Sequence, residues 1–155
     1  MKKLRENDSI LTGKMRAFKL ISFCILHLFT YCTPALIKKV EQIYEDGSPK
    51  VVSYYLKNEP KVLFKQQVYY ANHQLRIEGH FEKDEKNGDW IYYYENGVIW
   101  SKGDFKKGKM DGFQESFHPN GKPDIKGTYK DGIRIGKWYF YKENGELLKE
   151  INYDE

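Results

Sequence analysis

Cysteine, net charge and long hydrophobic runs are all missing from most of this chain of 155 residues. Both cysteines, Cys24 and Cys32, lie near the N-terminus, so the remainder can form no disulfide, cysteine-ligated zinc site or thiol nucleophile. Residues 1–32 hold six of the 26 basic and two of the 22 acidic residues, which leaves 20 of each sign elsewhere. That neutral remainder lacks the basic patch that nucleic-acid binding requires, so nucleic acid is not an expected partner.

A helical period is also missing, because no stretch after residue 40 repeats its hydrophobic residues every three or four positions. Hydrophobic residues make up only 40% of the chain, whereas tyrosine and glycine each occur 13 times. This composition suits many short strands and tight turns better than a thick globular core. We therefore expect an all-β fold.

A pattern of glycines, aromatic residues and a closing Asn-Gly recurs every 24 residues, with its markers at His73, Gly97, Gly121 and Gly145. Self-similarity at a fixed period of this length indicates a repeat architecture with atypical terminal units. We predict a degenerate unit at 43–72, three units at 73–96, 97–120 and 121–144, and a half unit at 145–155.

Each unit contains the pattern of a β-hairpin. Alternate positions are apolar or glycine, as in Leu75, Ile77, Gly79 and Phe81, and this period of two predicts a half-buried strand. A turn, an aromatic-rich second strand and an Asn-Gly turn follow. We predict an elongated antiparallel β-meander of tandem hairpins whose open ends can pair with another copy.

A glycine in the middle of each first strand weakens that strand unless a neighbouring ring lies over it. The glycines are Gly79, Gly103 and Gly127, and the predicted covering rings are Tyr93, Phe117 and Tyr141.

An uncharged, largely apolar run extends from Leu20 to Ile37, with Arg16 and Lys19 before it. A basic segment that leads into an apolar one is typical of an export signal or anchor. We therefore predict an N-terminal hydrophobic helix within 1–37, followed by the repeat domain at 38–155. Acidic residues are unusual in such basic segments, so Glu6 and Asp8 suggest that translation starts at Met15.

This apolar run allows three main interpretations. Phe29-Thr-Tyr-Cys32 is a loose lipobox, in which Cys32 is lipidated. Alternatively, a soluble exported protein is cleaved after Ala35, or the run, about 27 Å long as a helix, stays as a membrane anchor. A buried helix is a fourth possibility. The three main interpretations place the repeats outside the cytoplasm if the basic flank stays inside.

The repeated pattern resembles the MORN repeat in its bacterial variant, over roughly residues 40–155. It is similar to proteins labelled YwqK-type antitoxins. Gln114 stands where the other units have tryptophan. The resemblance implies association with proteins or a membrane surface. The residues that match best are Gly127, Tyr129, Gly132, Gly136, Trp138, Tyr141 and Gly145.

No residue pattern indicates catalysis. His73, His80 and His118 have no metal-ligand spacing, and the carboxylates are scattered over the polar positions. The glycine pairs four residues apart precede no helix and no Gly-Lys-Ser/Thr, so they are not phosphate loops. We expect no enzyme activity, no cofactor and no metal.

The second strands of the middle and last units are apolar on both faces, which a single layer cannot bury. Exposed aromatic side chains commonly mark interfaces. We predict a partner-binding aromatic strip of Trp90, Tyr92, Trp138 and Phe140. The alternative is that the sheet coils and these rings cover its own surface.

These observations favour a non-enzymatic repeat protein of the bacterial cell envelope that binds or scaffolds other proteins. A cytoplasmic antitoxin-like protein that sequesters a partner is the alternative, and it requires another role for the apolar run. A binder of carbohydrate or lipid surfaces would use the same aromatic side chains.

Overall fold

A computed structural model describes residues 34–154. The chain divides into two units, Met1–Cys32 and Thr33–Glu155, and only the second is described below. The predicted export signal, its hydrophobic helix up to residue 33, the start at Met15 and the lipidation of Cys32 lie outside the described residues. Within the described part, no helix is both long and apolar enough to cross a bilayer.

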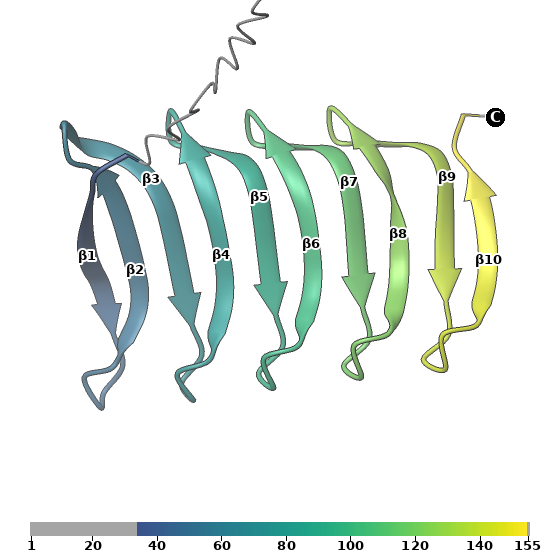
Figure 1. Cartoon of the computed structure of the whole chain (residues 1–155), viewed down its shortest axis with the longest axis horizontal. Coiled ribbons are helices and arrows are strands. Elements are labelled where there is room, and N and C mark those ends of the chain that lie inside the picture. Colours follow the sequence, from purple (N-terminus) through teal and green to yellow (C-terminus); the bar gives the residue numbers. More distant parts are fainter. Residues whose placement is uncertain (1–33, 155) are drawn as a thin grey trace, which may run out of the picture. The chain divides into compact units, whose positions relative to one another are not determined.

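The described chain is a single antiparallel sheet of ten strands whose spatial order is their sequence order (Figure 1). The fold is therefore the predicted all-β meander. The strands are β1 (Leu36–Ile43), β2 (Pro49–Leu56), β3 (Glu59–Tyr69), β4 (Leu75–Glu82), β5 (Glu85–Tyr93), β6 (Ile99–Lys106), β7 (Lys109–Phe117), β8 (Pro123–Lys130), β9 (Ile133–Tyr141) and β10 (Leu147–Asn152).

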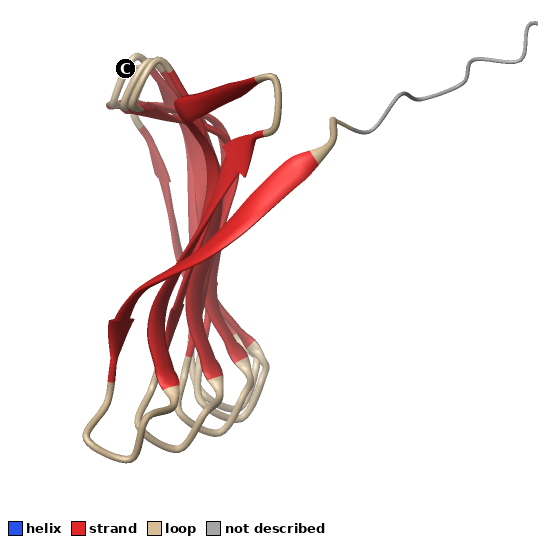
Figure 2. Ribbon diagram, turned by 90° about the vertical axis from the view of Figure 1, so that its left-hand side faces the viewer, coloured by secondary structure: helices blue, strands red, loops and turns tan. Residues whose placement is uncertain are grey.

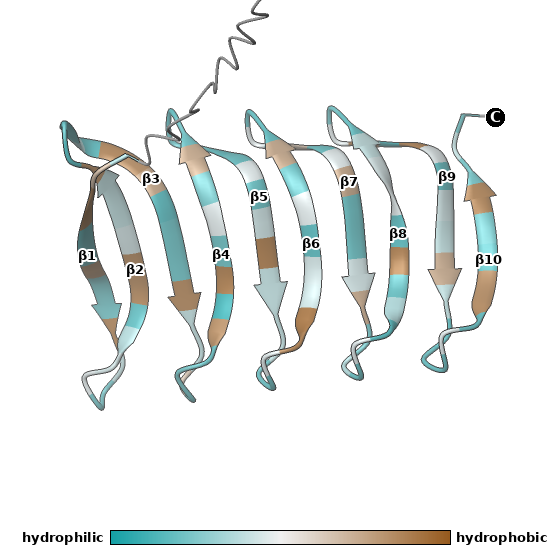
Figure 3. Cartoon of the chain, viewed as in Figure 1, coloured by the Kyte–Doolittle hydropathy of each residue, from teal (hydrophilic) through white to brown (hydrophobic). Residues whose placement is uncertain are grey.

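Strand β1 begins at Leu36, two residues before the predicted start of the repeat domain. Leu36 and Ile37 pair with Leu56 and Tyr55 of β2, so these last two residues of the apolar run belong to the sheet. Bands of opposite hydropathy alternate along many strands (Figure 3). This alternation is the period of two that predicted the strands.

The sheet is one layer thick and strongly twisted at its β1 end (Figure 2). Its buried hydrophobic core is correspondingly small and consists of Val52, Trp90 and Trp138. A single layer therefore has two faces. The tryptophan face carries Trp90 and Trp138, and the charged face carries Glu78, Lys102 and their cross-strand neighbours.

Two kinds of turn alternate along the sheet. Between β6 and β7, Lys107 and Gly108 both have positive φ angles (49° and 77°), as a tight two-residue hairpin requires. Between β5 and β6, the Gly97 amide donates a hydrogen bond to the Tyr94 carbonyl at 2.9 Å, and Gly97 has a φ of 82°. The Asn-Gly pairs thus close three-residue loops, which confirms the predicted hairpins.

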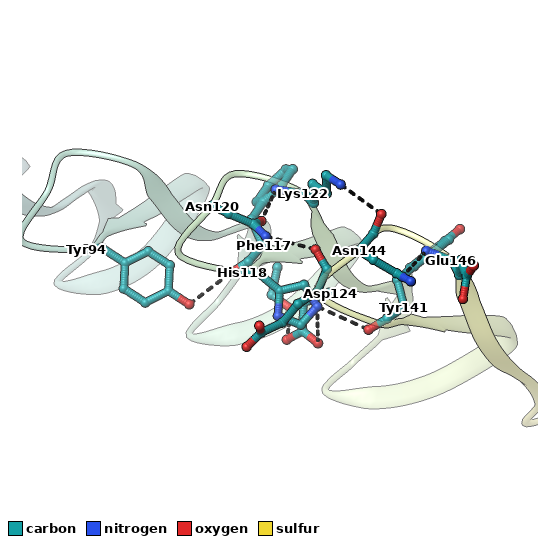
Figure 4. Close-up of polar contacts among 11 residues, drawn as sticks. Tyr94, Phe117, His118, Asn120, Lys122, Asp124, Tyr141, Asn144 and Glu146 are labelled. Atoms are coloured by element: carbon teal, nitrogen blue, oxygen red, sulfur yellow. Dashed lines mark hydrogen bonds and ion pairs between the residues drawn. The ribbon is translucent and has the colours of Figure 1, made fainter.

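Successive Asn-Gly turns are tied to one another through side chains (Figure 4). Asn120 Oδ1 accepts from the Lys122 amide at 2.9 Å within its own turn, while its Nδ2 donates to the Glu143 carbonyl of the next turn at 2.8 Å. In addition, Tyr94 Oη donates to the Phe117 carbonyl at 2.9 Å. The turns therefore form a polar ladder that runs across the sheet at one end of its strands.

Candidate functional site

On the tryptophan face, two indole rings lie directly over glycines of the preceding strand. Trp90 of β5 is paired with Gly79 of β4, and a Cβ atom at Gly79 would stand 2.2 Å from Cδ2 of the indole. A Cβ atom at Gly127 would stand equally close to the Trp138 ring. Gly79 and Gly127 therefore provide room for a ring, as predicted, but that ring is tryptophan, and at Gly103 the nearest side chains are Met110 and Gln114.

The prediction that Tyr93, Phe117 and Tyr141 cover these glycines is wrong. Two of them pack with lysines of the charged face instead: Lys102 Nζ lies 5.5 Å from the Phe117 ring centroid, and Lys126 Nζ lies 5.1 Å from that of Tyr141. The error lies in the choice of face: Trp90 is paired with Gly79, and Tyr93, three residues further along the strand, points to the other side of the sheet.

Each indole occupies a slot walled by further aromatic rings. The Phe81 and Phe105 rings meet the Trp90 ring edge-on, with centroids 5.2 and 5.9 Å away. Lys86 Nζ lies 4.0 Å from the indole centroid, a cation–π contact. The indole Nε1 donates to the His80 carbonyl at 3.0 Å.

The slot around Trp138 repeats the ring and cation contacts two periods later in the sequence, but Trp138 Nε1 is buried without a hydrogen-bond partner. Tyr129 and Tyr153 stand edge-on to the indole, with centroids 4.9 and 6.1 Å away. The Arg134 guanidinium carbon lies 4.3 Å from the ring centroid, and Arg134 Nη1 also donates to Tyr153 Oη at 2.9 Å. Arg134 thus supplies the cation over this indole, as Lys86 does over Trp90.

The predicted aromatic strip lies on one face, but its tryptophans are not exposed. Trp90 is 4% exposed and Trp138 is fully buried, because the glycines let both rings lie against their own sheet. Tyr92 and Phe140 are half-buried. A binding role for the four residues stays a prediction, and direct contact with a partner is open chiefly to Tyr92 and Phe140.

Between the two filled slots, the tryptophan face is hollowed by a pocket of about 390 Å³. It lies where Gln114 replaces the tryptophan of the neighbouring units. The sequence pattern singles out this exchange, but a loss of one ring does not by itself predict a cavity. The main lining residues are Tyr92, Trp100, Gly103, Phe105, Met110, Gln114, Tyr129 and Arg134.

A few polar groups converge on this pocket. Gln114 Nε2 donates to Ser101 Oγ at 3.2 Å, and Ser116 Oγ donates to Asp124 Oδ2 at 3.2 Å. Ser116 is only 7% exposed. An apolar cavity with a few polar groups at its boundary is the usual form of a small-ligand site.

The charged face carries cross-strand ion pairs. Lys65 Nζ lies 2.8 Å from Glu78 Oε2, and Lys102 Nζ lies 3.3 Å from Glu115 Oε2. Asp104 is the exception, because it stands opposite Asp89. A hydrogen bond to Asp89, together with burial, raises the pKa of the Asp104 carboxyl above its usual range.

The three histidines of the described residues serve the turns and the strand packing. His118 Nε2 lies 3.1 Å from the Tyr141 carbonyl and so extends the ladder of turn contacts. His73 Nε2 lies 3.2 Å from Asp46 Oδ2, and the His80 ring packs edge-on against Phe64. Nowhere between residues 34 and 154 do three His, Cys, Asp or Glu side chains gather as metal ligands.

The 24-residue period of the sheet is also found when the chain is compared with known protein families. Three tandem segments match the family model of the MORN repeat variant. The matches cover 86–107, 110–131 and 134–155, and their starts are 24 residues apart. The first residues of these matches are Lys86, Met110 and Arg134, and two of them are the cations that lie over the indole rings. The chain is thus a repeat protein, and three of its segments are similar to the MORN repeat variant. No curated protein matches it.

Proposed function

We propose that this chain is a non-enzymatic protein of the bacterial cell envelope that binds or scaffolds other proteins through its MORN-type sheet. The observation that supports it is the single layer: each strand pairs only with its sequence neighbours, which leaves two broad faces across residues 34–154. Trp100 and Phe113, both 50% exposed, present rings on opposite faces. Exposed rings of this kind are enriched in protein interfaces.

We assign binding to the tryptophan face. Tyr92 and Phe140 offer partly exposed rings there, and Trp100 lies beside Tyr92 with ring centroids 6.1 Å apart. Trp90 supports this surface indirectly, since its ring lies 6.3 Å from that of Tyr92. The charged face is the weaker candidate because its lysines and glutamates satisfy one another across the strands.

Cross-linking in membrane extracts tests the binding function. We expect the wild-type chain to capture a defined partner and the double variant Tyr92→Ala/Phe140→Ala to lose it while keeping its strand signal in circular dichroism. Phe113→Ala, which removes an exposed ring from the charged face, is the matched control and should capture as well as wild type. Equal capture by all three proteins would contradict the assignment of the face.

The proposed location rests on the apolar run from Leu20 to Ile37 and its basic flanks, most of which lies outside the described residues. We expect the chain in the membrane fraction, labelled by a fatty-acid analogue, and Cys32→Ser unlabelled. A chain found only in the cytosolic fraction would contradict the envelope location and favour an antitoxin-like role. A membrane-bound but unlabelled chain would contradict lipidation alone.

A further inference from the structure

The pocket at Gln114 has the architecture of the two indole slots without the indole. In the filled slots, the ring lies over a glycine and between two aromatic side chains that stand edge-on to it. The corresponding residues around the pocket are Gly103, Phe105 and Tyr129, and all three line it. One repeat unit thus retains the glycine and both walls of the slot.

The space over Gly103 is only partly filled by flexible side chains. The atoms closest to a Cβ placed at Gly103 are Met110 Cε at 3.1 Å and Gln114 Cγ at 3.3 Å, whereas an indole atom stands at 2.2 Å in the other two units. Accordingly, Gly103 is half-buried, while Gly79 and Gly127 are buried. The remaining cavity of about 390 Å³ is at the small end for ligand pockets, which suits one ring system.

The pocket's chemistry favours an aromatic ring that carries an N–H donor. Methionine packs favourably against aromatic rings, and Met110 stands at the position of the slot cations Lys86 and Arg134. In the Trp90 slot the indole N–H donates to the carbonyl of His80, and the residue one period later is Asp104, whereas the Trp138 N–H has no partner. Tyr92 and Trp100 add aromatic surface at the side of the pocket.

We propose that this pocket binds a tryptophan side chain of a partner protein, inserted as a planar ring over Gly103 between Phe105 and Tyr129. The same walls hold a tryptophan twice within this chain, each time presented from a polypeptide backbone. The choice of a protein side chain rather than a free aromatic molecule rests on the proposed binding function. The pocket would then be the most specific contact on the tryptophan face.

Fluorine NMR with two probes, 5-fluoroindole and N-acetyl-5-fluorotryptophan amide, tests this inference. We expect both to bind the full chain with a dissociation constant on the order of 1 mM, typical of a single ring system. N-acetyl-leucine amide should fail to displace them. The inference is overturned if the amide does not bind, or if the leucine compound displaces it as well as unlabelled tryptophan amide does.

A blocking variant locates the bound ring. Gln114→Trp restores the repeat pattern, so its own indole should fill the slot and weaken binding of the amide probe at least tenfold. Gln114→Phe is a second, smaller blocking variant in case the first one fails to fold. Phe113→Ala, on the opposite face of the same strand, should bind like wild type. Unchanged binding by a folded Gln114→Trp chain would place the ring elsewhere and overturn the inference.

The probes separate this inference from the proposed function. If the wild-type chain binds the amide but captures no protein from membrane extract, the proposed function is wrong and the slot still accepts tryptophan. If 5-fluoroindole binds and the amide does not, the slot serves a free aromatic molecule, and the proposal that it takes a partner's side chain is overturned. If Gln114→Trp captures its partner as well as wild type does, the partner does not use the slot.

Discussion

The indole of Trp138 lies so close to Gly127 that a Cβ atom there would stand 2.2 Å from Cδ2 and 2.3 Å from Cε2 of the ring. Trp90 and Gly79 repeat the same distances. A fixed ring cannot withdraw from such a contact without leaving its slot, which the edge-on rings and the cation above it define. The glycine and the tryptophan therefore form one packing unit, and the layer stays thin because a ring lies flat against the backbone.

Adding a methyl group at these glycines should be costly. We expect Gly79→Ala and Gly127→Ala each to lower the free energy of unfolding by about 2–3 kcal/mol, as overpacking in a filled core does. Gly103→Ala should cost less than about 1 kcal/mol, because its Cβ would meet the mobile end of Met110. Urea unfolding followed by circular dichroism measures all three. Equal losses for the three variants would show that the indoles are not the cause.

The sequence predicts the architecture of this sheet well because its signals are local. The alternation of residues such as Ile77 and Gly79 marks the strands, and Lys107-Gly108 and the Asn-Gly pairs mark the turns. A meander then needs no further information, since each strand pairs with the next. The 24-residue period is confirmed by both the strands and the three matched segments.

The register between strands is not a local property, and the position of Trp90 opposite Gly79 depends on it. The turn at Lys83 and Asp84 pairs Glu82 with Glu85, so a regular ladder would place Gly79 opposite residue 88. The bulge moves the partner to Trp90, and nothing in the alternation predicts this shift. For the same reason, the burial of the tryptophans and the hollow at Gln114 emerge only from the paired strands.

The turn between β4 and β5 is a site for stabilisation. Lys83 and Asp84 have φ angles of 52° and 63°, whereas the equivalent turns use Gly108 and Gly132 at the second position. Side chains other than glycine are strained in this region. We expect Asp84→Gly to raise the free energy of unfolding by about 0.5–1 kcal/mol, measured by urea unfolding. Gly108→Asp should lower it by a similar amount, and a gain from both variants would refute the argument.

The ladder of turns can be dissected at Asn120, which both accepts and donates. Asn120→Asp keeps the acceptor for the Lys122 amide but loses the donor to the Glu143 carbonyl, so we expect a loss of about 1 kcal/mol. Asn120→Ala loses both bonds and should cost about 2 kcal/mol. Thermal unfolding distinguishes the two. Should aspartate prove as costly as alanine, the contact between turns, rather than the turn itself, would dominate.

The opposed carboxyls of Asp89 and Asp104 on the charged face make the stability of the fold depend on pH. Because the pKa of Asp104 is raised in the folded chain, the folded state binds its proton more tightly than the unfolded state does. Ionisation therefore destabilises the fold as the pH rises from the ordinary carboxyl pKa of 3.8 through the raised value. We expect Asp104→Asn to raise the urea midpoint at pH 7, and this gain to shrink as the pH falls from the raised pKa to 3.8.

Asp111 is the matched control for that titration, because its neighbours shift its carboxyl pKa in the opposite direction. Lys130 Nζ lies 3.0 Å from Asp111 Oδ2, and this contact lowers the pKa of the Asp111 carboxyl below 3.8. Its ionised form stabilises the fold above pH 3.8, and that stabilisation is lost as the pH falls through the lowered value. Asp111→Asn should therefore lower the urea midpoint at pH 7 and have little effect at the acid limit. If Asp104→Asn and Asp111→Asn shifted the midpoint in the same direction at pH 7, the shifts would reflect general charge removal, and the specific pairing of Asp104 with Asp89 would be refuted.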